Sequence, residues 1–257
     1  MPAPKIALTI AGSDPSGGAG FQADLRTFQS MGVYGISIPS VLTAQNTRGV
    51  SGIHELSVSF ISEQLDTLLE DIRPDAMKTG MLYSAGAVQA VADKVNHYSL
   101  SNLVIDPVTV SSTGVMLIEE KAVDVMKGDL LPLAKVITPN IHEAELITGS
   151  KVRDEAGMKE AAVTLRSLGP EVVVITGGHL KDRALDLFFD GEEFLMLENE
   201  MLEGEYHGTG CVFSAAVTAC IALGLNAKEA FIKAKDVTFT AMKNSYDPGK
   251  GMKILKM

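Results

Sequence analysis

Short runs of β-branched and other apolar residues alternate with longer amphipathic stretches from one end of the chain to the other. This alternation is typical of successive β–α units, in which helices cover a mostly parallel sheet. We expect strands at residues 6–11, 36–43, 76–79, 103–105, 136–137, 172–175, 184–189 and 194–197. We expect helices at residues 20–31, 61–72, 85–96, 119–127, 141–148, 155–168, 210–223 and 227–245. Asp190-Gly191 is a two-residue hairpin signal between the last two strands, so this edge of the sheet should be antiparallel.

The length of 257 residues suits one large domain, and no Pro-rich or Ser/Gly-rich linker divides the chain. We therefore expect a single domain over residues 1–257. The net charge of −10 and the lack of any basic run argue against a nucleic-acid partner. Polar residues or Gly interrupt every apolar stretch before it reaches the ~20 residues that cross a membrane, and the first residues lack a targeting pattern. These features predict a cytoplasmic protein without a membrane partner.

A glycine-rich loop over residues 12–20 follows the first strand and precedes a helix, where backbone amides can approach a ligand closely. It contains Gly18-x-Gly20-x-x-Ala23, a loose dinucleotide fingerprint. That fingerprint needs an acidic residue at the end of the second strand, but this chain has Thr43-Ala44-Gln45-Asn46 there. A nicotinamide cofactor is therefore not supported, and the alternative to a ligand loop is a turn that only packs tightly.

Polar residues also stand at the ends of several expected strands, where α/β proteins bind ligands. Asp24 lies one turn into the first helix and taken alone is a solvated helix-face charge, whereas Lys78 could meet phosphate or lie on the surface. Asp106 ends a strand at a position that suits a metal ligand. Asn140 and Glu143 have the spacing of a capping box, and a role toward metal or phosphate is the alternative.

The chain has two further glycine turns. One follows an apolar strand, and the other precedes an apolar helix. Thr176-Gly177-Gly178-His179 is one, and its histidine lacks a paired catalytic residue nearby in the sequence. The other, His207-Gly208-Thr209-Gly210-Cys211, points successive amides at one place beside a helix N-terminus and predicts an anion hole. Cys211 falls in the first helical turn, where amide donors favour a thiolate that could act as base or nucleophile. The alternative is a helix capped by Thr209 with a small buried Cys.

These motifs together resemble one family in order and spacing over essentially the whole chain. The resemblance is carried by Ala-Gly-Ser-Asp-Pro-Ser-Gly-Gly-Ala-Gly-x-Gln-Ala-Asp-Leu from residue 11, and by residues 42–47, 78–82, 106–108, 137–140 and 207–211. The sequence is similar to hydroxymethylpyrimidine kinase / phosphomethylpyrimidine kinase of thiamin biosynthesis, in the ribokinase-like superfamily. This resemblance implies a three-layer α/β/α fold with a mostly parallel sheet and an antiparallel edge hairpin. It also implies transfer of the ATP γ-phosphoryl group to 4-amino-5-hydroxymethyl-2-methylpyrimidine and then to its monophosphate, with Mg²⁺, in a homodimer.

The resemblance assigns expected roles to particular residues. The pyrimidine pocket would be lined by Gly12, Ala19, Asp24, Gln45, Met81 and Val108, with Gln45 at the ring edge. The anion hole would be formed by Gly208, Thr209 and Gly210 beside the catalytic Cys211, which replaces the Asp of most sugar kinases. ATP would contact Lys78, Asn140, Thr176 and Gly178, and Mg²⁺ would be held by Asp106 and Glu143. Two features depart from relatives, namely the loop Thr109-Val110-Ser111-Ser112 and Thr176, where some relatives have Lys.

Two other functions stay open at this stage. Pyridoxal kinase has the same chemistry, but those relatives tend to carry Met rather than Gln45 and a second Cys where this chain has Ser111. A non-catalytic vitamin-binding protein could keep the same fold. The intact anion hole, Asp106 and Glu143 argue against it.

Overall fold

The expected alternation of strands and helices is present in the computed structural model, which describes residues 3–111, 114–177 and 183–257. The strands are β1 (Ile6–Ala11), β2 (Tyr34–Pro39), β3 (Val41–Asn46), β4 (Gly49–Glu55), β5 (Ala76–Thr79), β6 (Leu103–Ile105), β7 (Val136–Ile137), β8 (Val172–Ile175), β9 (Ala184–Phe189), β10 (Phe194–Asn199), β11 (Tyr206–His207) and β12 (Lys253–Ile254). The helices are α1 (Gly20–Ser30), α2 (Val58–Leu69), α3 (Ala85–His97), α4 (Glu120–Val125), α5 (Ile141–Thr148), α6 (Glu155–Ser167), α7 (Thr209–Ala222) and α8 (Ala227–Lys243). A π-helical turn (Met126–Leu130) and a 3₁₀ turn (Leu131–Leu133) follow α4.

The main sheet has the strand order β10-β9-β8-β7-β6-β5-β1-β2. Neighbouring strands run parallel from β2 to β8, and β9 is antiparallel to both β8 and β10. The antiparallel edge hairpin is thus confirmed, but its turn is longer than the two residues expected. Phe194 pairs with Phe189, so residues 190–193 all lie outside the ladder. The carboxylate of Asp190 accepts the amides of Glu192 and Glu193, each at 2.9 Å, and this stabilises the longer turn.

The expected strand over residues 36–43 is in fact two strands, which separate at Ser40. The Ser40 amide still donates to the Ala11 carbonyl at 3.0 Å, while its hydroxyl donates to the Met81 carbonyl at 2.6 Å. After this point β3 leaves the main sheet and pairs with β4 in an antiparallel ribbon of its own. The sequence did not indicate β4, because its residues are mostly polar or glycine and do not show a buried face.

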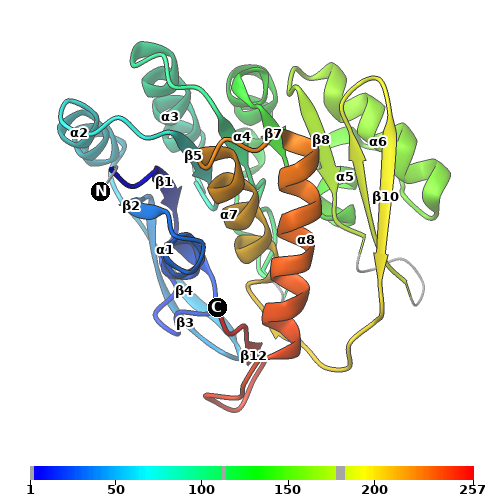
Figure 1. The fold of residues 1–257 in the computed structure, drawn as a ribbon. Coiled ribbons are helices and arrows are strands. Elements are labelled where there is room, and N and C mark those ends of the chain that lie inside the picture. Colours follow the sequence, from blue (N-terminus) through cyan, green and yellow to red (C-terminus); the bar gives the residue numbers. More distant parts are fainter. Residues whose placement is uncertain (1–2, 112–113, 178–182) are drawn as a thin grey trace.

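Helices cover both faces of the main sheet, with α1, α7 and α8 on one face and α2 to α6 on the other (Figure 1). Strand side chains alternate between these two layers: Leu8 and Ile10 pack with the α2–α6 layer, and Ala7 packs with the α7–α8 layer. Helix α7 is apolar around its whole circumference because it is buried between the sheet and its neighbours. Within the described residues, no helix combines the length and apolar character needed to cross a membrane.

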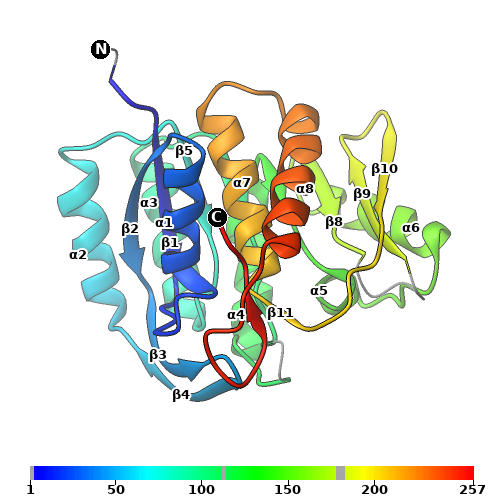
Figure 2. The ribbon, with the colours of Figure 1, turned by 60° about the horizontal axis from the view of Figure 1, so that its bottom comes forward.

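The segment after α8 returns across the molecule and joins two distant parts of it. Strand β12 pairs in parallel with β11, so that Ile254 lies beside His207. The Met252 amide donates to the Thr47 carbonyl at 2.9 Å, at the turn between β3 and β4. Figure 2 shows this segment lying next to the β3–β4 ribbon. The segment therefore connects the ribbon to the chain that leads into α7.

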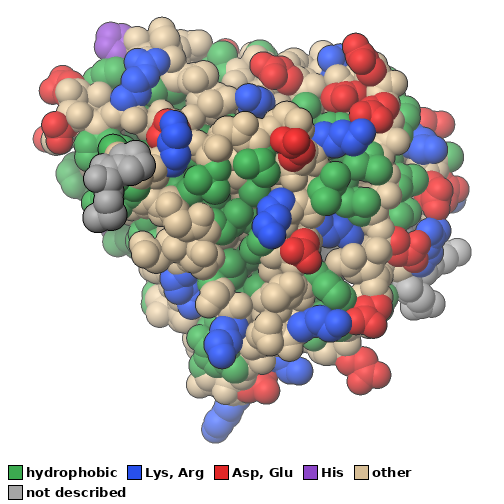
Figure 3. All heavy atoms as spheres, viewed as in Figure 1, with side chains coloured by type: hydrophobic (Ala, Val, Ile, Leu, Met, Phe, Trp, Pro, Cys, Tyr) green, Lys and Arg blue, Asp and Glu red, His purple; other side chains and the backbone are tan. Residues whose placement is uncertain are grey.

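Charged residues of both signs are interspersed on the face that Figure 3 shows. Lys and Arg side chains on that face alternate with Asp and Glu instead of forming a continuous basic stripe. On this face, therefore, the described residues form no continuous basic stripe of the kind that contacts nucleic-acid backbones.

Candidate active site

The glycine-rich loop after β1 is held in shape by the carboxylate of Asp14. Its two oxygens accept the amides of Ser16 at 2.9 Å and Ala19 at 2.8 Å. Gly20 has a φ of +61°, and a Cβ there would lie 2.4 Å from the Gly12 carbonyl oxygen. The loop thus folds back on the end of β1, and Gly20 is required at its closing point.

The loop before α7 packs directly against this glycine-rich loop. Gly208 has a φ of +80°, and a Cβ there would lie 1.9 Å from the Gly18 carbonyl oxygen. A Cβ on Gly18 would in turn lie 2.3 Å from the His207 ring. Both glycines are therefore needed for the close approach of two segments that are far apart in the sequence.

Helix α7 begins beside this contact and leaves amides available at its first turn. Gly208 is the N-terminal flanking residue, and the Val212 amide is the first to close a helical turn, donating to Gly208 at 2.9 Å. The amides of Thr209, Gly210 and Cys211 have no acceptor within the helix. A Cβ on Gly210 would face open space, so this end of α7 is accessible. The arrangement suits an anion. The alternative in which Thr209 caps the helix is wrong, because Thr209 is already helical.

A buried ionic cluster lies behind this turn. Lys78 Nζ is 2.7 Å from Asp24 and 3.7 Å from Asp106, and the Lys78 and Asp24 side chains are fully buried. Thr9 donates to Asp24 at 2.6 Å, and Ser214 donates to Asp106 at 2.8 Å. Asp24 is thus not a solvated helix-face charge and offers no surface to an open pocket. Lys78 is not a surface residue either, and in this structure it has no access to an ATP phosphate.

Burial and charge act on this cluster in opposite directions. Burial alone would lower the pKa of Lys78. The charges of Asp24 and Asp106 raise that pKa by more, so Lys78 stays a charged ammonium group. Burial raises the pKa of Asp24 and of Asp106 by more than Lys78 and their hydroxyl partners lower it. Two carboxylates therefore share one cation in an enclosed site.

The expected thiolate at Cys211 is not present in this structure. Burial raises the pKa of the Cys211 thiol to about 12, and the nearby Lys78 charge opposes that rise only in part. A hydrogen bond from the Gly20 amide acts in the same direction as Lys78 and is weaker still. The stabilisation expected from the helix N-terminus is thus outweighed by loss of water, and Cys211 is a neutral thiol near pH 7.

Asn140 and Glu143 form the capping box that their spacing predicts. The Asn140 side chain accepts the Glu143 amide and the Glu143 carboxylate accepts the Asn140 amide, both at 2.9 Å. Burial, followed by the charge of Asp106, raises the pKa of Glu143 to about 8. Capping thus does not separate Glu143 from the site, because Asp106 is close enough for its charge to raise the pKa of Glu143. Among the described residues, no three His, Cys, Asp or Glu side chains come together as a metal cluster.

Most of the expected pocket residues lie close together. A Cβ on Gly12 would be 3.2 Å from the Met81 sulphur, and Met81 packs in one apolar cluster with Val108. The Gln45 amide nitrogen lies 3.1 Å from His207 Nε2. His207 links this group to the glycine-rich loop, since its ring lies against that loop. The β3–β4 ribbon, the ends of β1 and β5, and the loop before α7 therefore meet at one place.

The remaining expected residues lie at neighbouring strand ends or outside the described residues. Ala19 is half-buried beside Gly208. Thr176 pairs with Asn140 across the ends of β7 and β8. Gly178 lies outside the described residues.

Four residues of the site carried no role in the sequence analysis: Thr9, Asp14, His207 and Ser214. A signal existed for Thr9, which is a polar residue inside an otherwise apolar strand, and for Asp14 and His207, which belong to quoted motifs. Ser214 gave no such signal, because its contact with Asp106 depends on how α7 packs against β6.

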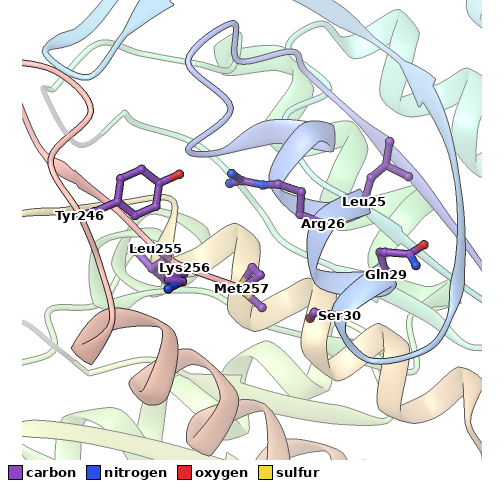
Figure 4. Close-up of a pocket in the computed structure, with 8 residues that line it drawn as sticks. All are labelled: Leu25, Arg26, Gln29, Ser30, Tyr246, Leu255, Lys256 and Met257. Carbon is purple, nitrogen blue, oxygen red and sulfur yellow. The ribbon is translucent and has the colours of Figure 1, made fainter.

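A separate hollow of about 490 Å³ lies between α1 and the C-terminal segment (Figure 4). It is lined by Leu25, Arg26, Gln29, Ser30, Tyr246, Leu255, Lys256 and Met257. None of the expected site residues contributes to it.

Comparison with known proteins identifies several similar chains. A family model described as phosphomethylpyrimidine kinase matches residues 14–256. The thiamine biosynthesis bifunctional protein ThiED of Geobacter sulfurreducens is 45% identical over 246 residues, which is 95% of this chain and 50% of that protein. This chain thus spans about half the length of that relative. The hydroxymethylpyrimidine/phosphomethylpyrimidine kinase of Bacillus subtilis is 42% identical over 95% of this chain and 92% of its own length.

Solved structures of two kinds share the fold. An ADP complex of Bacillus subtilis pyridoxal kinase has a TM-score of 0.91 and 39% identity, covering 99% of this chain and 97% of that one. The phosphomethylpyrimidine kinase of Clostridium difficile has a TM-score of 0.83 and 39% identity, covering 93% and 99%. The similarity therefore includes kinases named for two different substrates.

Proposed function

The chain belongs to the phosphomethylpyrimidine kinase family, and from that membership we propose its reaction in thiamin biosynthesis. It is a kinase that transfers the γ-phosphoryl group of ATP to the hydroxymethyl oxygen of 4-amino-5-hydroxymethyl-2-methylpyrimidine. A second transfer, to the resulting monophosphate, gives the pyrophosphate. The observation that carries this proposal is the first turn of α7, with its available amides beside the glycine-rich loop.

The amides of Thr209, Gly210 and Cys211 would stabilise the negative charge on the transferring phosphoryl group. Phosphoryl transfer depends mainly on positioning and on charge stabilisation, with little covalent chemistry from the protein. Gly208 supports this role because its left-handed conformation starts the helix against the glycine-rich loop.

Cys211 would lie beside the accepting hydroxyl and take its proton as the new bond forms. Its raised pKa of about 12 means that the thiolate is scarce before the substrate binds. The partial positive charges of the anion-hole amides must therefore contribute more to the rate than Cys211 contributes as a base. Lys78 supports Cys211 because its positive charge lowers the pKa of the thiol.

We propose that Asp106 and Glu143 would hold a Mg²⁺ ion. Their two carboxylates are buried and close enough that the charge of Asp106 raises the pKa of Glu143. Mg²⁺ prefers oxygen ligands and is commonly bound by one or two carboxylates together with substrate phosphates. When bound, the ion would neutralise phosphate charge. Asn140 and Thr176, which are neighbours at the ends of β7 and β8, would bind ATP phosphates beside it.

The pyrimidine would bind where Gln45, Met81 and Val108 meet the glycine-rich loop. A primary amide donates and accepts hydrogen bonds at once, which suits the amino group and ring nitrogen of an aminopyrimidine. Pyridoxal is the second candidate substrate, and the TM-score of 0.91 to a pyridoxal kinase favours it. Gln45 distinguishes the two, because pyridoxal lacks that paired edge.

Product analysis by mass spectrometry tests the proposal. The protein is incubated with Mg·ATP and either the hydroxymethylpyrimidine or pyridoxal. We expect the pyrimidine monophosphate followed by the pyrophosphate. The matched controls are Gly210→Val, which should give neither product, and Cys220→Ala on the same helix, which should give both. Phosphorylation of pyridoxal alone would identify a pyridoxal kinase, and transfer to neither compound would overturn the proposed function.

The oligomeric state and location are proposed on the resemblance alone. We propose a homodimer, which sedimentation equilibrium tests through the mass in solution. We propose a cytoplasmic location, which fractionation of cells tests.

A further inference from the structure

Gln45, His207 and Asp14 form a chain of contacts across three segments of the proposed pyrimidine pocket. His207 Nε2 lies 2.8 Å from Asp14 Oδ2 and 3.1 Å from the Gln45 amide nitrogen. The side chains of His207 and Asp14 are 6% and 1% exposed, so water has little access to the contact between them. A single ring nitrogen therefore faces two partners at once.

The proton on this ring nitrogen follows from its surroundings. Asp14 accepts the amides of Ser16 and Ala19, as an ionised carboxylate does. Burial raises the pKa of Asp14, but hydrogen bonds from His207 and Ser16 lower that pKa by more. His207 Nε2 must therefore carry hydrogen and donate to Asp14. Nδ1 of the same ring is buried without a partner among the described residues, so a hydrogen there would lack an acceptor.

A nitrogen that donates cannot also accept from the NH₂ group of Gln45. The hydrogen bonds of Thr43, on the other side of the Gln45 amide, support the same conclusion. Its hydroxyl donates its one hydrogen to the Ser13 carbonyl at 2.8 Å, yet the Gln45 amide oxygen also lies 3.1 Å away and needs a donor. A half-turn of the amide exchanges its oxygen and nitrogen, which have nearly the same shape. The oxygen then shares the Nε2–H of His207 with Asp14, and one hydrogen of the NH₂ group donates to the Thr43 hydroxyl, which keeps its own hydrogen on Ser13.

We propose that His207 is a positioning residue whose Nε2–H holds the amide of Gln45 in this one orientation and so sets the donor–acceptor order that the substrate meets. The inference rests on the proposed function, because it concerns the aminopyrimidine substrate. The His207 ring cannot swing away, since it is packed against Gly18, where even a Cβ would be 2.3 Å from it. A pyrimidine whose amino group is replaced by an oxo group reverses the order of donor and acceptor at that edge, so a fixed amide rejects it.

The test is the ratio of kcat/KM for the 4-amino pyrimidine to kcat/KM for its 4-oxo analogue. His207→Phe keeps a ring against Gly18 but removes the donor, which frees the Gln45 amide to rotate. We expect the ratio to fall about tenfold or more, mainly through KM. Any disturbance of the neighbouring anion hole affects both substrates alike and cancels in the ratio.

Four further comparisons make the result specific. His207→Gln places an NH₂ group near the position of Nε2 and should retain the ratio, whereas His207→Asn is too short and should lose it even if His207→Phe folds poorly. His54→Gln, on the exposed side of β4, should match wild type. In a Gln45→Ala background, His207→Phe should change the ratio no further.

An unchanged ratio in folded His207→Phe and His207→Asn would overturn the inference, as would a further loss in the Gln45→Ala background. These outcomes leave the kinase assignment intact, because wild type still phosphorylates the 4-amino pyrimidine. A wild-type protein that phosphorylates neither pyrimidine would overturn the proposed function and the inference with it.

Discussion

Replacing Lys78 by Met removes the one cation that two buried carboxylates share. Met has a similar length and no charge, so the change leaves Asp24 and Asp106 without their partner at 2.7 and 3.7 Å. Removing one member of a buried ion pair costs about 3–5 kcal/mol of stability. The remaining carboxyls limit that cost by taking up a proton in the folded state.

The free-energy cost of keeping one of these carboxyls protonated follows from the ordinary Asp pKa of 3.8. Keeping one such group protonated at pH 7 costs about 4.4 kcal/mol, at about 1.4 kcal/mol per pH unit. The folded variant then binds one proton more than the unfolded chain, so its stability falls as pH rises. The loss relative to wild type should therefore shrink by up to about 2.8 kcal/mol between pH 7 and pH 5, since the raised pKa values of Asp24 and Asp106 give wild type part of the same gain.

Urea unfolding followed by far-UV circular dichroism measures this loss, which suits a chain without Trp. Adding Asp24→Asn to Lys78→Met should recover stability at pH 7. The matched control is Lys228→Met, which breaks a half-exposed pair with Glu193 and should leave stability near wild type at both pH values. An equal loss at pH 7 and pH 5 in Lys78→Met would refute the reasoning and point to packing instead of charge.

Three other predictions concern the proposed site. In a Cys220→Ala background, iodoacetamide should alkylate Cys211 on the order of 50-fold more slowly than free cysteine at pH 8, because a high pKa leaves little thiolate. The rate should rise about tenfold per pH unit up to pH 10, and a plateau near pH 9 would contradict the raised pKa of about 12. Gly210→Val should lower kcat by about 10²-fold or more at an unchanged Tm, since its Cβ meets open space, whereas Gly208→Ala should lower Tm. Thermal unfolding and steady-state kinetics separate the two, and full activity in folded Gly210→Val would exclude the anion hole. Gln45→Met should weaken aminopyrimidine binding by about 5- to 150-fold while sparing pyridoxal, and a parallel loss on both substrates would contradict its role at the ring edge.

The sequence predicted the main sheet well because burial imposes a period on each strand and helix. Strand β5 and strand β8 are continuous apolar or buried runs, and both have the expected bounds. Strands β11 and β12 have two residues each and exist through pairing between residues near 206 and 253. Such pairing depends on the tertiary fold, so no local pattern in the sequence could indicate it.

The site was predicted in its location but only in part in its chemistry. The polar residues at strand ends meet as expected, because parallel strands bring those ends to one edge. The burial of Asp24 and Lys78 could not be derived, since it depends on how α1 packs on β1 and how α7 packs on β5. One signal becomes recognisable once the strand register is known. Thr9 and Lys78 are register partners on β1 and β5, and both are polar in apolar surroundings.

The connection made by the segment after α8 has a consequence for the order in which the molecule is completed. All strands of the main sheet precede residue 200 in the chain, whereas Met252 and Ile254 are made after them. During synthesis on the ribosome the sheet can form first, but the turn at Thr47 and the strand that carries His207 gain their shared neighbour only with these late residues. A growing chain that already has its sheet would therefore complete an ordered ligand site only after these later residues have been added.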